Sequence, residues 1–309
     1  MRHYFVMRAF FSKWWTYQRE RFPVLAHGPL IASFSGSALA YSALLTGHLS
    51  VPWPAWVAAF VVCFIFFLQL RIADEFKDAD EDRRFRPYRP VPRGLVKLRE
   101  LAVVFGLGAV VQFGAAWWRH PPLVWALVIA WCYLALMSVE FFARTWLKAR
   151  PITYMWTHMF IMPIVDFFAT ACLWMPAGLR PGPGLAWFLA ASYANGLVIE
   201  IGRKIRRPED EETGVETYSR LWGRERALTV WWCCLGAVVV FATTAASFVG
   251  RGLVVGLVLG CAWAAVVAAS APMRAARIPG KRLEALAGAW TLLLYFSVGL
   301  VPWLWRVMQ

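Results

Sequence analysis

Residues 71–94 carry acidic side chains at spacings that suit a metal ion. The segment reads RIADEFKDADEDRRFRPYRPVPRG. If one helix runs through it, Glu75, Asp78 and Asp82 fall within about a 60° arc, because each helical residue advances about 100°. Asp80 and Glu81 would point elsewhere. Carboxylates on one face repel one another unless a cation lies among them, and oxygen-only ligands of this kind suit Mg²⁺.

Three arginines follow the acids, and each lies next to a proline. Prolines end a helix and favour an extended turn, and guanidinium groups bind phosphate in a forked geometry. The segment could therefore hold a metal ion together with a phosphate. A charged linker that solvates itself would have the same composition, and the charge pattern alone leaves both interpretations open. The residues concerned are Arg86, Arg89 and Arg93, with Pro87, Pro90 and Pro92.

The composition excludes a water-soluble globule. Of the 309 residues, 60% are hydrophobic and only 16% are charged, whereas an average soluble chain is about a quarter charged. The net charge of +14 and the 19 tryptophans indicate basic loops and interfacial anchors that face anionic lipid or an anionic substrate, and no nucleic acid. The six cysteines lie in apolar stretches without CxxC spacing, so neither a disulfide framework nor a zinc site is expected.

Nine apolar stretches are long enough to cross a membrane, which takes about 20 helical residues each. An all-α membrane protein is therefore predicted, with a single nine-helix domain at 29–304 preceded by an interfacial amphipathic segment at 1–28. Two connections, 71–99 and 203–226, are long and charged. The predicted spans are 29–48, 52–71, 101–118, 121–143, 153–175, 183–201, 227–249, 252–271 and 283–304.

The basic residues lie on one side of these spans. The segment before the first span and the connections after the second, fourth, sixth and eighth spans hold 28 of the 32 Lys and Arg residues, including Arg274 and Arg277 after the eighth. The positive-inside rule then places the N-terminus and both long connections in the cytoplasm and the C-terminus outside. The expected location is the cell inner or plasma membrane.

The acidic segment resembles the first signature of the UbiA family of intramembrane prenyltransferases, NDxxDxxxD followed by an RP-x-x-x-G turn. Asp74 stands in the place of the family's Asn, and Glu75 in the place of its first Asp. The resemblance extends along the chain through the nine spans and through GVETYSRLWG, which is similar to the GxxT...G ending of the second signature. The matching residues there are Gly214, Thr217 and Gly223.

Membership of this family implies a helical bundle with a central cavity and a cytoplasmic polar cap, in which Mg²⁺ bridges the acids to an isoprenoid diphosphate. The implied metal ligands are Asp74, Glu75, Asp78 and Asp82, the last three being the implied catalytic acids. The predicted diphosphate-binding residues are Arg86, Arg89, Arg93, Lys148, Arg150, Lys204 and Arg207. Lys148 and Arg150 would look the same if they were ordinary interfacial anchors.

The second signature departs from the family pattern, which has a DxxxD pair before the glycine. Glu200 can stand for the first acid, but Lys204 occupies the second place. Asp210 lies at the right distance before Gly214 to be the second acid, which would require an insertion between the two acids. We expect Glu200 and Asp210, and not Glu200 and Lys204, to complete the metal site. On a continued helix Glu200 shares a face with Arg203, Lys204 and Arg207, so the alternative is a surface ion pair worth only about 0.3–0.5 kcal/mol.

A polar side chain within a membrane span is costly and usually faces the bundle interior. Asp166, Asn195 and Gln112 are therefore candidates for acceptor binding or for lining the cavity, although Asp166 could equally be protonated and structural. No GxSxG motif, Cys/His pair or phosphate-cradling glycine loop suggests a covalent nucleophile.

The predicted function is Mg²⁺-dependent transfer of a prenyl group from an isoprenoid diphosphate to a lipophilic, most often aromatic, acceptor in the membrane. A terpene cyclase on the same scaffold is one alternative, in which the cation attacks its own chain. A transporter or lipid-binding protein is the other, because many spans and an intramembrane acid also suit translocation. Against it, the densest ionisable cluster lies at the predicted membrane surface.

The charge bias generates a topology prediction. A reporter inserted in the 71–99 connection should be cytoplasmic, and one fused after residue 309 should be outside, because basic loops resist translocation. Reporter activity or labelling by a membrane-impermeant reagent measures this. An outer location for the 71–99 connection would contradict both the topology and the predicted site.

Overall fold

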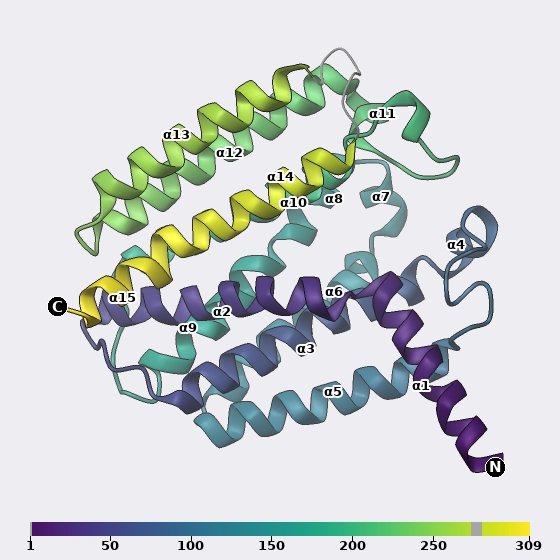
Figure 1. Ribbon diagram of the computed structural model, residues 1–309, viewed down its shortest axis with the longest axis horizontal. Coiled ribbons are helices and arrows are strands. Elements are labelled where there is room, and N and C mark those ends of the chain that lie inside the picture. Colours follow the sequence, from purple (N-terminus) through teal and green to yellow (C-terminus); the bar gives the residue numbers. More distant parts are fainter. Residues whose placement is uncertain (1, 273–279) are drawn as a thin grey trace.

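The computed structural model describes residues 2–272 and 280–309, and this part of the chain contains helices and no strand (Figure 1). Arg274 and Arg277 lie outside the described residues. The helices are α1 (Arg2–Arg21), α2 (Val24–Thr46), α3 (Trp53–Lys77), α4 (Ala79–Phe85), α5 (Leu98–Arg119), α6 (Leu123–Ser138), η1 (Glu140–Phe142), α7 (Arg144–Lys148), α8 (Pro151–Met159), α9 (Ile161–Trp174), α10 (Gly184–Arg203), η2 (Pro208–Asp210), α11 (Tyr218–Trp222), α12 (Arg224–Ser247), α13 (Gly252–Ser270), α14 (Gly280–Tyr295), η4 (Phe296–Leu300) and α15 (Val301–Val307).

Eight helical stretches of the described chain are long and apolar enough to cross a membrane, and they correspond to eight of the predicted spans. The predicted span at 121–143 forms α6, which has 16 residues and is therefore shorter than the roughly 20 that a perpendicular span needs. A count of nine spans stays a prediction. Two spans are composite: α8 and α9 meet at Phe160, and α14 continues through the π-helical turn η4 into α15.

The interior of the bundle is built on α2, α9, α10 and α14, which pack against one another. Small residues allow close approach at these crossings, as is usual between membrane helices. A Cβ atom added at Gly299 of η4 would overlap the backbone carbonyl of Ser37 in α2. A Cβ atom at Gly196 of α10 would come within 2.9 Å of the Met162 side chain in α9.

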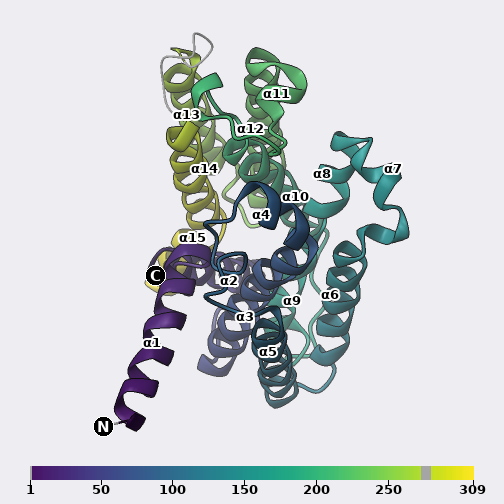
Figure 2. The same ribbon diagram turned by 90° about the vertical axis from the view of Figure 1, so that its right-hand side faces the viewer.

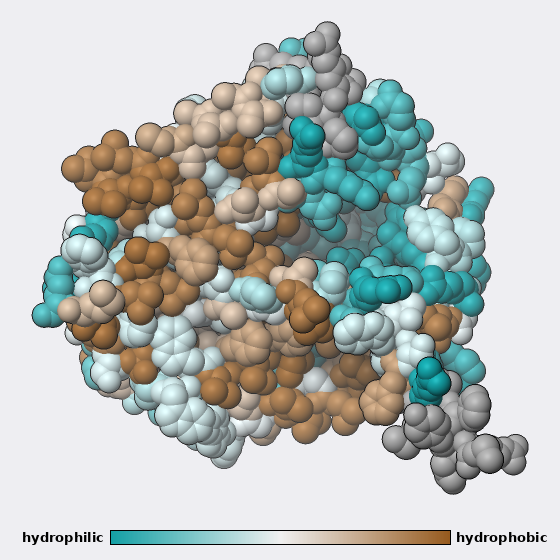
Figure 3. Space-filling view, in the orientation of Figure 1, coloured by the Kyte–Doolittle hydropathy of each residue, from teal (hydrophilic) through white to brown (hydrophobic). Residues whose placement is uncertain are grey.

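The surface of the molecule is divided into an apolar body and a hydrophilic end. Figure 3 shows hydrophobic residues over most of one face, and hydrophilic residues gathered around a hollow at the end where α4 and α11 lie. Helices α5 and α13 contribute large exposed apolar side chains, among them Val103, Leu107, Val110, Leu253 and Leu257. Such a surface is stable only against lipid, so the chain is an integral membrane protein.

Helix α1 stands apart from the bundle at its N-terminal end and joins it at its C-terminal end (Figure 2). The segment predicted at 1–28 is thus shorter than expected, because α2 already begins at Val24 after Pro23, and Pro29 lies inside the α2 helix. Tyr17 of α1 is buried in a small apolar cluster with Ile72, Val96 and Leu101, so this end of α1 is part of the folded domain.

The contact between η4 and α2 generates a stability prediction. Gly299→Ala should destabilise the protein by roughly 1–3 kcal/mol, because the new methyl group forces the two backbones apart. Gly288→Ala in α14 is the matched control, since nothing lies within 4 Å of its added Cβ, and it should be neutral or slightly stabilising. Thermal unfolding in detergent compares the two. Equal melting temperatures would contradict the close packing.

Candidate functional site

The first acidic segment lies where α3 emerges at the hydrophilic end. The expected single helix is interrupted: α3 ends at Lys77, and Asp78 has φ −96° and ψ 9° before α4 begins. The interruption is small, because the Asp78 amide donates to the Asp74 carbonyl at 2.9 Å and the Asp82 amide donates to the Asp78 carbonyl at 2.8 Å. The acids therefore still follow one another on successive turns.

Glu75 is buried and bound to a residue that the sequence did not predict. Its side chain is 1% exposed, and the Arg21 guanidinium of α1 forms an ion pair with its Oε1 atom. The Oε2 atom is also buried and has no hydrogen-bond partner among the described residues. The neighbouring Asp74 is more exposed and lies 3.5 Å from Arg71 and 3.8 Å from Lys77.

Asp78 is half-buried at the break between α3 and α4. No Lys, Arg or His nitrogen of the described chain lies within ion-pair distance of its carboxylate. Burial raises its pKa above the ordinary value, the carboxylates of Asp74 and Asp82 raise it further, and Lys77 acts in the opposite direction. Asp78 is thus an acid whose charge is poorly compensated.

Asp82, in contrast, is fully compensated. Its side chain is 2% exposed, and Oδ1 accepts hydrogen bonds from Arg86 and Arg89, both at 2.8 Å. Arg89 also donates to Oδ2 at 2.6 Å. Arg93 points away from this pair and bonds to Glu20 of α1 at 2.9 Å. Two of the three predicted phosphate-binding arginines therefore hold an acid of the motif, and the third holds α1.

The acids expected to point away from the motif do so. Asp80 is 97% exposed and lies 3.6 Å from Arg83. Glu81 pairs with Lys148 of α7, which lowers the pKa of Glu81 below its ordinary value. Lys148 thereby joins the segment to the connection after α6, whereas Arg150 stacks on the Trp146 ring, with its guanidinium carbon 4.5 Å from the centroid.

The second acidic segment has its own basic partners. Glu200 is 4% exposed at the end of α10, and it pairs with Lys204 at 2.8 Å and with Arg203 at 2.5 Å. The expected helical face including Arg207 is not formed, because α10 ends at Arg203 and the chain becomes extended. Arg207 instead binds Asp210 with two hydrogen bonds of 2.8 and 3.0 Å.

The two charged connections contact each other. The Phe85 ring at the end of α4 lies against Gly214, whose φ of +76° and lack of a side chain both suit this contact. Tyr88 donates to Glu212 at 3.2 Å, and Arg206 donates to the same carboxylate group at 3.0 Å. The two charged connections thus form one polar layer, called the cap below, which contains both signatures.

The acidic side chains of the cap suit a divalent metal ion, but they are not arranged around a common point. Within residues 2–272 and 280–309, no three acidic, His or Cys side chains come together as a group that could hold an ion. The unpartnered Oε2 of Glu75 and the poorly compensated carboxylate of Asp78 are available acceptors on successive turns. The predicted pair of Glu200 and Asp210 would have to exchange its arginine and lysine partners before both could bind a metal.

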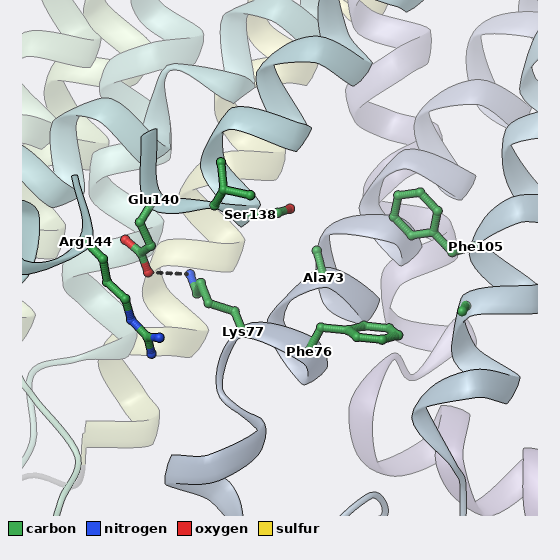
Figure 4. A pocket seen from close by; sticks show the side chains of 9 residues that line it. Ala73, Phe76, Lys77, Phe105, Ser138, Glu140 and Arg144 are labelled. Atoms are coloured by element: carbon green, nitrogen blue, oxygen red, sulfur yellow. Dashed lines mark ion pairs between the residues drawn. The ribbon is translucent and has the colours of Figure 1, made fainter. Parts of the chain in front are cut away.

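A polar cluster beside the motif was not predicted. Lys77 donates to Tyr154 at 2.7 Å and lies 4.0 Å from the buried Glu140. Burial raises the pKa of Glu140, and Lys77 opposes the rise. His158 lies 4.0 Å from the other oxygen of Glu140. The cluster adjoins a groove of about 560 Å³, shown in Figure 4, with Lys77 and Glu140 on one side and Phe76 on the other.

The cluster includes a strained stretch of backbone. Three consecutive residues other than glycine, Glu140, Phe141 and Phe142, have positive φ angles of 53°, 52° and 58°. Such angles are costly for bulky side chains and occur where the surroundings enforce them. Neither Glu nor Phe favours this conformation, so the local sequence contains no signal for the turn.

The three polar residues predicted inside the spans form bonds between helices. Asp166 of α9 accepts a hydrogen bond of 2.7 Å from Tyr295 of α14. Asn195 of α10 donates to Thr291 of α14 at 3.2 Å. Gln112 of α5 donates to the Val62 carbonyl of α3 at 3.0 Å and accepts from Trp131 of α6, also at 3.0 Å. All three are buried, and each joins neighbouring helices of the bundle.

Solved structures share this fold. A UbiA homologue from Aeropyrum pernix K1, in its apo form, is 14% identical with a TM-score of 0.67, over 90% of this chain and 98% of that one. A digeranylgeranylglyceryl phosphate synthase is 15% identical with a TM-score of 0.58, over 94% and 99%. A UbiA homologue from Archaeoglobus fulgidus, bound to DMAPP and Mg²⁺, is 12% identical with a TM-score of 0.57, over 90% and 98%.

Sequence similarity leads to the same family. No curated protein sequence matches the chain at a significant level. The profile of the UbiA prenyltransferase family, however, matches residues 33–283, which include both acidic segments, six of the eight spanning stretches in full and most of the first. The resemblance seen in the acidic signature is thereby confirmed, and the chain belongs to the UbiA prenyltransferase family.

Proposed function

We propose that the protein transfers a prenyl group from an isoprenoid diphosphate to a lipophilic, aromatic acceptor, with Mg²⁺ as cofactor. The observation that carries this proposal is the cap itself, which holds the unpartnered Oε2 oxygen of Glu75, the unpaired carboxylate of Asp78, and arginines and lysines that already bind anionic oxygens. Homologues from Archaeoglobus fulgidus bind DMAPP or GPP together with Mg²⁺, which supports the same ligands here.

The side chains of the cap can perform the binding part of this reaction. Glu75 and Asp78 would hold the cation, with Asp74, Asp82, Glu200 and Asp210 as further predicted ligands. Mg²⁺, when bound, supplies positive charge that stabilises the departing diphosphate. Arg86 and Arg89 could release Asp82 and turn their guanidinium forks to phosphate oxygens, because carboxylate and phosphate accept the same paired hydrogen bonds.

The bundle below the cap would keep water from the prenyl cation. Aromatic side chains stabilise cations through their π faces, and an apolar interior excludes the water that would otherwise trap them. The acceptor then attacks the first carbon of the prenyl group, and the ring proton leaves. We place the cap on the cytoplasmic side, on the basis of the charge bias of the connections.

The alternatives are distinguished by stoichiometry and by location. A terpene cyclase would release diphosphate without consuming an acceptor, so consumption of one acceptor for each diphosphate excludes it. A transporter would be expected to hold its ionisable groups near the middle of the membrane. Here the intramembrane Asp166 is bound to Tyr295 between helices, and the dense cluster of charges lies at one end.

Substitution of Asp78 tests the metal site. Asp78→Asn should abolish Mg²⁺-dependent turnover, whereas Asp80→Asn should be mild, since Asp80 is solvent-exposed. The raised pKa of Asp78 means that its ionised form is disfavoured in the folded chain, so this acid lowers stability at pH values above that pKa. Asp78→Asn should therefore leave the metal-free melting temperature at pH 7 unchanged or raised. A marked fall would point to folding damage instead.

Paired substitutions test the second acidic segment. Lys204→Met should raise the KM for the diphosphate substrate roughly 10- to 100-fold, because a charge-assisted hydrogen bond is lost. Lysine has no acceptor atom and cannot ligate a metal, whereas the carboxylate of Asp210 can. Asp210→Asn should therefore weaken activation by Mg²⁺. Kinetic titrations with substrate and with Mg²⁺ separate the two effects. An unchanged Mg²⁺ dependence in Asp210→Asn would leave Glu200 as the only acid of this segment at the metal.

A further inference from the structure

Helix α1 is attached to the site by ion pairs as well as by packing. Lys13 pairs with Glu100 of α5 at 2.6 Å, near the start of that helix. Arg93 pairs with Glu20 at 2.9 Å. The third pair joins Arg21, the last residue of α1, to Glu75. Of these three pairs, only that of Arg21 reaches an acid of the proposed metal site.

The pair of Arg21 and Glu75 is the most buried of the three. The two side chains are 10% and 1% exposed, whereas those of Lys13 and Glu100 are 22% and 34% exposed. The guanidinium binds Oε1 and leaves Oε2 buried without a partner among the described residues. One oxygen of this carboxylate is thus held by α1, and the other remains without a partner among the described residues.

This arrangement compensates for a departure from the family signature. Glu75 has one more methylene group than the Asp that the signature carries, and therefore one more rotatable bond to fix before it can bind a metal. Arg21 fixes it from outside the part of the chain that the family profile matches, which begins at residue 33. Partners that orient a metal-binding carboxylate in this way affect metal affinity strongly.

We propose that Arg21 is a positioning residue of the cation site, and that α1 holds Glu75 so that its Oε2 atom faces the metal. This inference rests on the proposed Mg²⁺ dependence. The arginine acts through Glu75 and does not itself bind the ion. The opposite role, in which Arg21 blocks the site and competes with the ion, predicts an effect of opposite sign when the arginine is removed.

The test is a titration of the purified full-length protein with Mg²⁺ in the presence of inorganic diphosphate, followed by calorimetry and by the melting temperature. Arg21→Met should weaken Mg²⁺ binding about 10- to 100-fold. Lys13→Met is the matched control, because it removes a different α1 ion pair and leaves Glu75 untouched. Its Mg²⁺ affinity should stay within about twofold of the wild type.

The outcomes that overturn the inference are distinct from failure of the proposed function. Equal losses in both variants would mean that docking of α1 matters and that Arg21 has no special role. Unchanged or tighter Mg²⁺ binding in Arg21→Met would exclude positioning. If the wild type itself binds no Mg²⁺ with diphosphate, the proposed function fails as well, and the wild-type titration identifies that case directly.

A second pair of variants keeps the inference testable if Arg21→Met does not fold. Arg21→Lys retains the charge but lacks the Nε–H group that binds Glu75 Oε1, so its loss of Mg²⁺ affinity should be smaller than that of Arg21→Met. Glu75→Asp withdraws the carboxylate from Arg21, and in that background Arg21→Lys should have no further effect on Mg²⁺ binding. Additive losses in the double variant would show that the two residues act independently, which contradicts the proposal.

Discussion

Charge compensation at the cap is the constraint on which the rest of the structure depends. Buried carboxylates are stable only beside cations, and removal of one partner from a buried ion pair costs about 3–5 kcal/mol. Glu75, Asp82 and Glu200 are each buried, and each is bound by arginine or lysine. Asp78 lacks such a partner. The arginines and lysines of the cap therefore already bind anionic oxygens. A bound metal ion would take their place at the carboxylates, and they would then be free to bind a diphosphate.

The fold supplies these partners from separate parts of the chain. Arg21 comes from α1, Arg86 and Arg89 from the turn after α4, and Lys204 from the end of α10. Below the cap, Asp166, Asn195 and Gln112 bond to neighbouring helices and fix the bundle. These interior polar residues thus join neighbouring helices, whereas the charged side chains gather in the polar layer at one end.

The sequence predicted the elements well because length and hydrophobicity determine membrane helices directly. It also placed the acids of the first segment on successive turns. It could not predict the partner of Glu75, because Arg21 lies 54 residues away in the chain. The sequence also contained no sign of the left-handed turn at Glu140–Phe142, because these residue types do not favour positive φ angles. Because α10 ends at Arg203, Arg207 binds Asp210 and does not share a helical face with Glu200.

Mass spectrometry of the reaction products tests the account most directly. Purified protein would be supplied with Mg²⁺, a panel of prenyl diphosphates and candidate aromatic acceptors, and both the lipid extract and the released diphosphate would be quantified. The account predicts an acceptor heavier by one prenyl group, one diphosphate released for each acceptor consumed, and no product when Mg²⁺ is chelated. Release of diphosphate with only cyclic hydrocarbon formed, or product formation that is indifferent to chelation of Mg²⁺, would contradict it.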